Sequence, residues 1–165
     1  MNRNKIVSLE QAVGRTRQLR ARGKIIVTAN GSFDLLHAGH VRFLQTAKEQ
    51  GNVLVVGVNS DASVRRYKSP LRPVNPERQR AEVVAALEAV DLVVIFDEED
   101  PRAFLAAIRP DVHVNGSEYG PDCIEREVVE RGGGRIHLVQ HSEAVSSTEI
   151  MRRIVEIARS ERKLT

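Results

Sequence analysis

The sequence has little of several residue types, and each shortage excludes a class of protein. It contains one cysteine, Cys123, among 165 residues, so a fold held together by disulfides within the chain is excluded. A lone cysteine is also more often structural than catalytic. Tryptophan is missing and aromatic residues make up only 4% of the chain. This scarcity argues against the aromatic platforms on which single-stranded nucleic acid stacks.

Long apolar runs are missing as well. No stretch approaches the about 18 consecutive apolar residues that a membrane-spanning helix needs, and the N-terminus lacks the apolar segment of a signal peptide. We therefore expect no membrane partner and a cytoplasmic location. The net charge is only +3, with 25 basic and 22 acidic residues scattered among one another. This balance suits a small anionic substrate at least as well as nucleic acid, and we expect no nucleic-acid partner.

The remaining composition is that of a globular domain. Hydrophobic residues make up 41% and charged residues 28% of the chain, which is ordinary for a soluble protein. The length suffices for one domain with a real core, and no repeat, low-complexity tract or linker interrupts it. The sequence therefore predicts a single domain over residues 1–165.

Short apolar runs alternate with helical patterns along the chain. The runs predict strands at residues 24–29, 53–58, 91–96, 112–115 and 136–139. The patterns predict helices at residues 8–22, 41–50, 62–66, 77–89, 102–108, 124–131 and 150–159. In the helix over 77–89, Val83, Val84 and Leu87 are expected to face inward. This alternation predicts an α/β fold with a doubly wound, parallel, five-stranded sheet and right-handed crossovers.

The stretch after the first predicted strand carries the strongest functional signal. It reads Asn-Gly-Ser-Phe-Asp-Leu-Leu-His-Ala-Gly-His over residues 30–40. A strand, a tight turn and a helix N-terminus present free backbone N–H groups and a positive dipole end, which suit a phosphate. His37 and His40 are three residues apart, so they point the same way on one helical turn. We therefore expect a polyphosphate site here, and Gly31 lets the ligand approach the backbone closely.

Two other interpretations of the histidine pair stay open. A histidine at a helix start is more often a cap or a surface residue than a catalytic one. Two histidines at this spacing can also belong to a metal site. Because no nearby cysteine or third histidine completes such a site, we expect no metal centre built from protein ligands.

Polar residues follow four of the five predicted strands. The carboxyl ends of parallel strands meet at one edge of the sheet, where ligands bind, so we expect these residues to lie together. They are His37 and His40, Asn59 and Asp61, Asn115 to Tyr119, and Ser146 to Thr148. The loop over residues 67–75 adds the positive charges of Lys68 and Arg72. Residues 146–149 also have the spacing of a capping box for the last helix.

The chemistry of these groups favours the transfer of a nucleotidyl group. The sequence shows hydrogen-bond donors but no serine elbow, no cysteine in a catalytic context and no P-loop. Donors without a nucleophile suit a single step, in which the phosphate of a second substrate attacks the α-phosphorus and pyrophosphate leaves. Mg²⁺ would be carried mainly by the triphosphate.

The stretch from Gly31 to His40 resembles the first signature of the nucleotidyltransferase superfamily, Gly-[Ser/Thr]-Phe-Asp-x-x-His-x-Gly-His, and matches it throughout. The chain is also similar, in the expected order over residues 24–155, to bacterial D-glycero-β-D-manno-heptose-1-phosphate adenylyltransferases. The similar segments are residues 58–61, Lys68 with residues 72–78, residues 86–91, 109–111, 116–119 and 146–150.

This resemblance implies a Rossmann-like nucleotidyltransferase fold and a reaction. ATP and D-glycero-β-D-manno-heptose 1-phosphate would give ADP-heptose and pyrophosphate, and the product would enter the lipopolysaccharide core. The implied partners are ATP with Mg²⁺, the sugar 1-phosphate and a second copy of the chain in a homodimer. In some bacteria the activity is fused to a sugar kinase, for which 165 residues leave no room.

The resemblance also implies roles for individual residues. The catalytic residues would be His37, His40 and Lys68. The same three would also bind the nucleotide, together with Gly31, Ser32, Phe33, Asn115, Gly116, Ser117, Tyr119, Ser147 and Thr148. The residues for the second substrate would be Asp34, Asn59, Asp61 and Arg72.

Two departures from related sequences bear on the substrate. Members of the adenylyltransferase family often have Lys where this chain has Asn115, so a phosphate contact by charge is lost there. Cytidylyltransferases carry Arg in the pattern Arg-Thr-x-Gly-Ile-Ser-Thr-Thr, where this chain has His141, and Ala144 replaces the Gly. The change weakens the expectation of CTP. Adenine is expected to pack against Ile150 or Ile154 near the backbone of Val145.

Three alternatives remain. The first is a cytidylyltransferase, or another nucleotidyltransferase, that acts on a different phosphorylated alcohol such as glycerol 3-phosphate. The second is a non-catalytic nucleotide-binding module, against which the intact histidine pair argues. The third is a fragment related to class I aminoacyl-tRNA synthetases, which share the His-x-Gly-His pattern. The chain is too short for their tRNA-binding domains and has no Lys-Met-Ser-Lys-Ser loop.

Overall fold

A parallel five-stranded sheet forms the centre of the computed structural model, which describes residues 5–140 and 146–161. The strand order is β3-β2-β1-β4-β5, and every paired neighbour runs in the same direction. The strands are β1 (Ile26–Gly31), β2 (Val53–Asn59), β3 (Leu92–Phe96), β4 (Val112–Gly116) and β5 (Arg135–Val139). This sheet confirms the doubly wound α/β class that the alternating pattern predicts.

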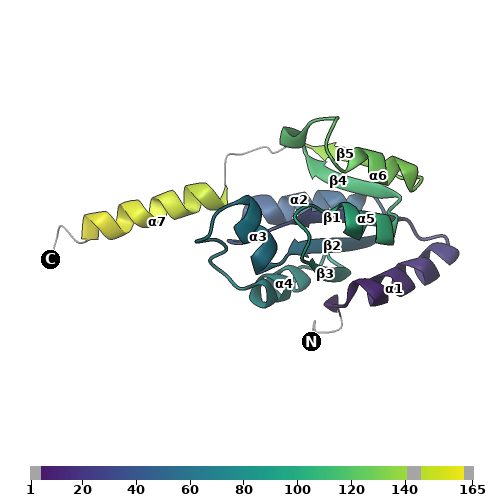
Figure 1. Cartoon of the computed structure of the whole chain (residues 1–165), viewed down its shortest axis with the longest axis horizontal. Helices are drawn as coiled ribbons and strands as arrows, with labels where there is room; N and C mark the ends of the chain where they lie inside the picture. The colour runs from purple at the N-terminus through teal and green to yellow at the C-terminus, as the bar shows by residue number, and fades with distance from the viewer. Residues whose placement is uncertain (1–4, 141–145, 162–165) are drawn as a thin grey trace.

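Helices cover both faces of the sheet (Figure 1). They are α1 (Leu9–Ala21), α2 (Ala38–Glu49), α3 (Asp61–Tyr67), α4 (Glu77–Ala85), α5 (Arg102–Ile108), α6 (Arg126–Arg131) and α7 (Ser147–Glu161), with a 3₁₀ turn η2 (Ser117–Tyr119). Side chains of α2 and α4 form the core on one face, and those of α1, α5 and α6 form it on the other. None of the helices in the described ranges is long and apolar enough to cross a membrane.

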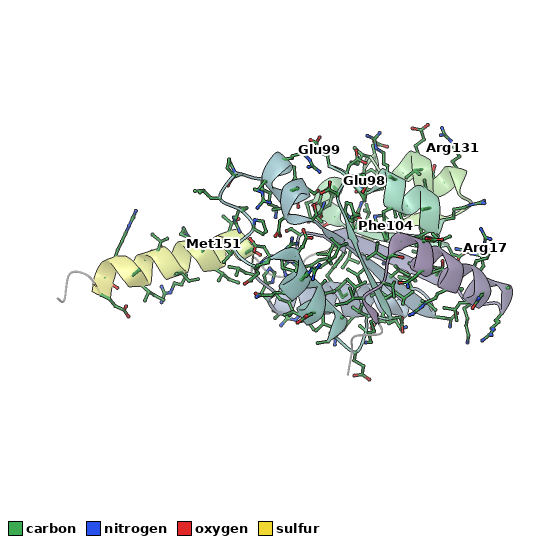
Figure 2. All side chains as sticks on the ribbon, turned by 60° about the horizontal axis from the view of Figure 1, so that its bottom comes forward. Arg17, Glu98, Glu99, Phe104, Arg131 and Met151 are labelled. Atoms are coloured by element: carbon green, nitrogen blue, oxygen red, sulfur yellow. The ribbon has the colours of Figure 1, made fainter. Side chains whose placement is uncertain are left out.

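Strand β2, in the interior of the sheet between β3 and β1, shows why the sheet is covered on both sides. Every residue from Val53 to Asn59 is buried, as expected for a parallel strand with helices on both faces. Gly57 allows a helix to approach closely, because a Cβ there would lie 3.1 Å from ring carbons of both Phe104 and Phe96. Phe104 is 1% exposed and lies inside the molecule, between α5 and the sheet (Figure 2).

The sheet reverses its direction of growth between β1 and β4. The chain adds β2 and β3 on one side of β1 and then crosses to add β4 and β5 on the other side. β1 pairs with β2 at six residue pairs but with β4 at only two, the last being Thr28↔His113. The two strands therefore part toward their carboxyl ends. Ligands of doubly wound sheets bind at such a point.

One inward-facing assignment is wrong. α4 ends at Ala85 instead of residue 89, and Val83 is 48% exposed although the sequence placed it inward. The buried residues of α4 are Arg80, Ala81, Val84 and Ala85. Their spacing of one and four residues defines the face toward the sheet, and Val83 lies outside that face.

Several predicted element ends are shifted. β1 runs from Ile26 to Gly31 instead of over 24–29, and α2 already begins at Ala38. α7 begins at Ser147, ahead of the predicted residue 150. Only half of the capping box predicted over residues 146–149 is present. The backbone N–H of Glu149 donates to Ser146 Oγ at 3.1 Å, but the Glu149 carboxylate pairs with Arg152 at 2.6 Å.

Candidate active site

The two histidines of the predicted phosphate site stack on each other at the start of α2. His37 is the N-cap residue, with an extended backbone (φ −141°, ψ 170°), and His40 lies in the first turn. Their ring centroids are 3.9 Å apart and their planes are inclined by 26°. The spacing argument correctly placed both imidazoles on one side. Both are partly exposed, so the pair lines the rim beside the positive end of the α2 dipole.

Phe33 supports this pair from the interior. Its ring is 4% exposed and meets the His40 ring edge-on, with 5.3 Å between the centroids. The backbone of Phe33 has φ 45°, in the left-handed region that costs free energy for a non-glycine residue. The same ring leaves little room above the strand, because a Cβ on Gly31 would lie 3.3 Å from it. Phe33 therefore shapes the turn by packing its ring, and the contact with the nucleotide that the resemblance implies for its backbone stays a prediction.

Lys68 reaches the same turn from the end of α3. Its ammonium group donates a hydrogen bond to Ser32 Oγ at 2.9 Å. Burial, together with the nearby positive charge of Arg72, lowers the pKa of Lys68 from its usual range. Burial likewise raises the pKa of Tyr67, while a hydrogen bond to Ser32 opposes that shift. Ser32, the first residue after β1 and part of the predicted nucleotide loop, is thus in contact with the loop that follows α3.

Asp34 fixes the loop over residues 72–75 to the β1–α2 turn. It is 2% exposed. One carboxylate oxygen accepts from the backbone N–H groups of Val74 and Asn75 at 2.7 and 3.0 Å, and the other accepts from Arg72 at 2.9 Å. Both residues were assigned to the second substrate from the resemblance. The structure shows them bonded to each other, so their visible role is to hold this loop against the site.

Arg80 is a central residue of the site that the sequence reasoning missed. Its side chain is fully buried. Its guanidinium donates to the carbonyl oxygens of Asn75, at 2.9 Å, and Ser32, and to the carboxylate of Asp61 at 2.8 Å. A single planar group thus joins the β1–α2 turn, the loop before α4 and the start of α3. The sequence did hold a signal for this role: Arg80 is a charged residue on the same helical face as the apolar residues Ala81 and Val84.

The other two polar positions after β2 also have partners inside the protein. Asp61, assigned to the second substrate, carries the ion pair with Arg80, and its backbone N–H donates to Glu77 at 2.7 Å. Asn59 is 5% exposed, and its amide donates to Ser63 Oγ at 3.1 Å. These contacts fix the N-terminus of α3. Lys68 lies at the opposite end of this helix, next to the β1–α2 turn.

The predicted nucleotide residues after β4 lie at the same edge. Asn115 and Gly116 end the strand as buried residues, and Ser117 opens the η2 turn. Asn115 is 5% exposed, whereas Tyr119 is 62% exposed. The end of β4 is therefore buried in the protein, whereas the η2 turn exposes the side chain of Tyr119 to solvent.

The first turn of α7 touches the histidine loop. Ser147 Oγ donates to the carbonyl oxygen of Leu35 at 3.2 Å, across 112 residues of sequence. The contact brings Ser147 beside the turn that holds His37, as the strand-end argument predicted, and exposed Thr148 follows it on α7. His141, Ala144 and Val145, on which the choice of base depends, lie outside the described residues.

Within residues 5–140 and 146–161, no three histidine, cysteine, aspartate or glutamate side chains gather as a metal site would need. The site is instead a set of donors at the carboxyl edge of the sheet: two imidazoles, one ammonium group and the N-termini of α2 and α7. Such a set binds and polarises phosphates. Fold and site together define an α/β protein whose donor set suits a phosphorylated ligand.

Comparison with known proteins identifies the family. Residues 28–153 match the family model described as Cytidylyltransferase-like, and the chain belongs to this family of nucleotidyltransferases. It is 49% identical over 138 residues to the bifunctional protein HldE of Pelobacter propionicus, covering 83% of this chain and 28% of that protein. It is 47% identical over 152 residues to HldE of Geobacter metallireducens, covering 92% and 31%. The chain thus spans less than a third of the length of these relatives.

Solved structures agree with the fold. A lipopolysaccharide core biosynthesis protein from Thermoplasma volcanium superposes with a TM-score of 0.61 at 28% identity, over 74% of this chain and 100% of that one. A pantoate-beta-alanine ligase from Francisella tularensis gives a TM-score of 0.60 at 15% identity, over 93% of this chain and 78% of that one. The second likeness concerns the fold alone.

Proposed function

We propose that this chain is an adenylyltransferase that forms ADP-heptose for the lipopolysaccharide core. It transfers AMP from ATP to D-glycero-β-D-manno-heptose 1-phosphate and releases pyrophosphate. The observation that carries the proposal is the stacked pair His37 and His40 at the start of α2, with Lys68 held at Ser32. The identity to HldE proteins and the likeness to a lipopolysaccharide core biosynthesis protein support the choice of acceptor.

The reaction is one displacement at the α-phosphorus. An oxygen of the sugar phosphate forms the new bond to phosphorus, the bond to the bridging oxygen breaks, and pyrophosphate leaves with the electron pair. The N–H groups of His37 and His40, those at the start of α2, and the ammonium of Lys68 stabilise the negative charge that builds on the phosphate oxygens. Because the attacking group belongs to the substrate, the protein supplies position and charge and needs no nucleophile of its own.

Magnesium fits this site as an ion that is bound mainly by the triphosphate and not by protein side chains. Mg²⁺ takes oxygen ligands, keeps several waters and is commonly bound through substrate phosphates. The nearby carboxylates of Asp34 and Asp61 already pair with Arg72 and Arg80. When bound, the ion would neutralise part of the phosphate charge, with its ligands mainly triphosphate oxygens and water.

The family description favours one rival, a cytidylyltransferase with another acceptor such as glycerol 3-phosphate. The decisive experiment supplies equal ATP and CTP with heptose 1-phosphate and identifies the nucleotide sugar by mass spectrometry. We expect predominantly ADP-heptose, because His141 supplies fewer donors to a cytosine ring than arginine would. Predominantly CDP-sugar contradicts the choice of base and leaves the reaction class standing.

A panel of sugar and alcohol phosphates, each with ATP, tests the acceptor in the same assay. We expect pyrophosphate release to be fastest with heptose 1-phosphate. Faster release with glycerol 3-phosphate or another alcohol phosphate would replace the proposed acceptor. A protein that binds ATP but releases no pyrophosphate with any acceptor would be a binding module instead of an enzyme.

A further inference from the structure

Helix α7 presents an apolar surface that the phosphate chemistry of the proposed reaction does not use. The helix spans 15 residues and extends away from the body (Figure 1), and none of its described residues is buried. Ile154, Val155 and Ile157 are 55%, 46% and 45% exposed. Its contact with the β1–α2 loop is made by Ser147, at its first turn. A row of large apolar side chains on an outward helix marks an interaction surface.

The apolar residues form one stripe along α7. Positions 150, 151, 154, 157 and 158 hold Ile, Met, Ile, Ile and Ala, and their spacing of three and four places them on one helical face. Met151 lies where the helix leaves the body (Figure 2). We call these five residues the α7 stripe.

The charges of α7 favour a protein partner over a lipid surface. The helix carries three arginines and three glutamates, so its own net charge is zero. Two of the arginines are paired along the helix, Arg152 with Glu149 at 2.6 Å and Arg153 with Glu156 at 3.8 Å. A helix that lies on an anionic membrane relies instead on an excess of basic residues on its polar face.

The apolar positions of the α7 stripe are arranged symmetrically about Ile154. Four positions away lie Ile150 and Ala158, and three positions away lie Met151 and Ile157. A stripe with this symmetry is complementary to a second copy of itself that runs antiparallel. In such a two-fold pair each contact occurs twice. Ile150 of one copy meets Ala158 of the other, Met151 meets Ile157, and Ile154 meets its own copy.

The charges follow the same symmetry with opposite signs. Five positions from Ile154 lie Glu149 and Arg159, and two positions away lie Arg152 and Glu156. Antiparallel pairing brings each of these charges level with one of opposite sign. Parallel pairing would bring each level with its own copy, which is unfavourable.

We propose that α7 pairs antiparallel with α7 of a second copy of this chain, with Ile154 at the two-fold axis. The α-helical rise gives the pair a length of about 20 Å, with one body at each end. The proposal concerns residues outside the histidine site, and it assigns Ile150 and Ile154 to the helix pair instead of to the adenine ring that the sequence led us to expect there.

Disulfide crosslinking tests the register directly. In a background with Cys123→Ser, the Ile154→Cys variant should form a covalent dimer rapidly under mild oxidation. Ile157→Cys, on the same stripe, is the matched control. Its own copy lies about 9 Å farther along an antiparallel pair, so it should crosslink slowly. Equal crosslinking at both positions would mean a parallel pair, and no crosslinking at either would mean that α7 does not self-associate. Either result overturns the proposal.

Sedimentation velocity tests the interface without a covalent bond. We expect the wild type to dimerise with rising concentration, and Ile154→Glu to weaken the dimer by roughly tenfold or more, because a carboxylate is buried at the axis. Ser160→Glu adds the same charge outside the stripe and should leave the dimer intact. A wild type that stays monomeric, or one that binds anionic vesicles as a monomer, contradicts the proposal. A dimer that tolerates Ile154→Glu contradicts it equally.

A charge swap adds a rescue. Glu149→Arg and Arg159→Glu should each weaken the dimer, since each brings like charges level, and the double variant should recover it. Absence of recovery would show that these charges do not set the pairing. Far-UV circular dichroism checks that every variant keeps its helix content.

Discussion

His113 lies in the middle of β4 and makes the stability of the fold depend on pH. The side chain is fully buried, and its Nδ1 lies 2.9 Å from Thr28 Oγ1 on β1. Burial lowers the pKa of His113 from 6.5 to about 4, while interactions with Asn115 and Thr28 oppose the shift. The imidazole is therefore neutral in the folded protein at neutral pH, in the part of the sheet where β1 and β4 still pair.

The size of the effect follows from the shift in pKa. Between pH 6.5 and about 4 the unfolded chain binds a proton at His113 that the folded chain does not. The unfolding free energy therefore falls as the pH falls through this window, and it is unaffected by this group above it. A shift from 6.5 to about 4 corresponds to about 3 kcal/mol at the acid end, since each pKa unit is worth about 1.4 kcal/mol.

Chemical denaturation at several pH values between 7.5 and 4.5 measures this loss, and His113→Gln removes the titrating group. We expect the difference between wild type and variant to change with pH by up to about 1.4 kcal/mol per unit. His137→Gln, at a partly exposed position on β5, is the matched control for removing an imidazole. A native His113 ring that titrates near 6.5 by NMR would refute the reasoning, as would parallel pH profiles of wild type and His113→Gln.

Three further changes test the site. His40→Ala should lower turnover by roughly two to three orders of magnitude with a smaller change in ATP affinity, because it removes a donor used in the transition state; turnover within a few-fold of wild type would argue against that role. Lys68→Ala should weaken ATP binding and turnover, and ATP should protect the wild-type loop over 67–75 from proteolysis, whereas equal cleavage with and without ATP would speak against loop closure. Arg80→Ala should lower the unfolding free energy by about 3 kcal/mol or more in urea titrations, because it leaves the Asp61 carboxylate without its buried partner; a much smaller loss would mean that Arg80 does not hold the three segments together.

The fold was predictable from the sequence because the buried strands are nearly continuous apolar runs. Val53–Asn59 is buried at every position, and this requirement appears directly in its composition. The strand order was not predictable, since a run that is apolar on both faces carries no record of its neighbours. The end of α4 was misjudged for a related reason. Residues 86–89 suit a helix, but hydrogen bonds from Leu87 to Val84 and from Val90 to Leu87 turn the chain toward β3.

The site was predictable where one short segment forms it. Residues 37 and 40 belong to one helical turn, so their spacing alone fixed the stacked pair. The contacts of Asp34 and Arg80 join segments 38 to 48 residues apart in the chain. Local patterns do not encode such pairings, so the sequence did not reveal that Asp34 anchors residues 72–75, and its role toward the second substrate stays a prediction.

The charged residues of this site are of two kinds: some pair with an opposite charge within the protein, and Lys68 hydrogen-bonds to a neutral group. Asp34 pairs with Arg72 and Asp61 pairs with Arg80, so these four charges largely compensate one another within the protein. Lys68 contacts a neutral hydroxyl, and the neighbouring Arg72 contributes to its lowered pKa. A cation that is not compensated by its hydrogen-bond partner and lies near a second positive charge gains most when an anion arrives. The buried pairs thus hold the loop in place, and we propose that Lys68 gives its positive charge to the phosphates of the nucleotide.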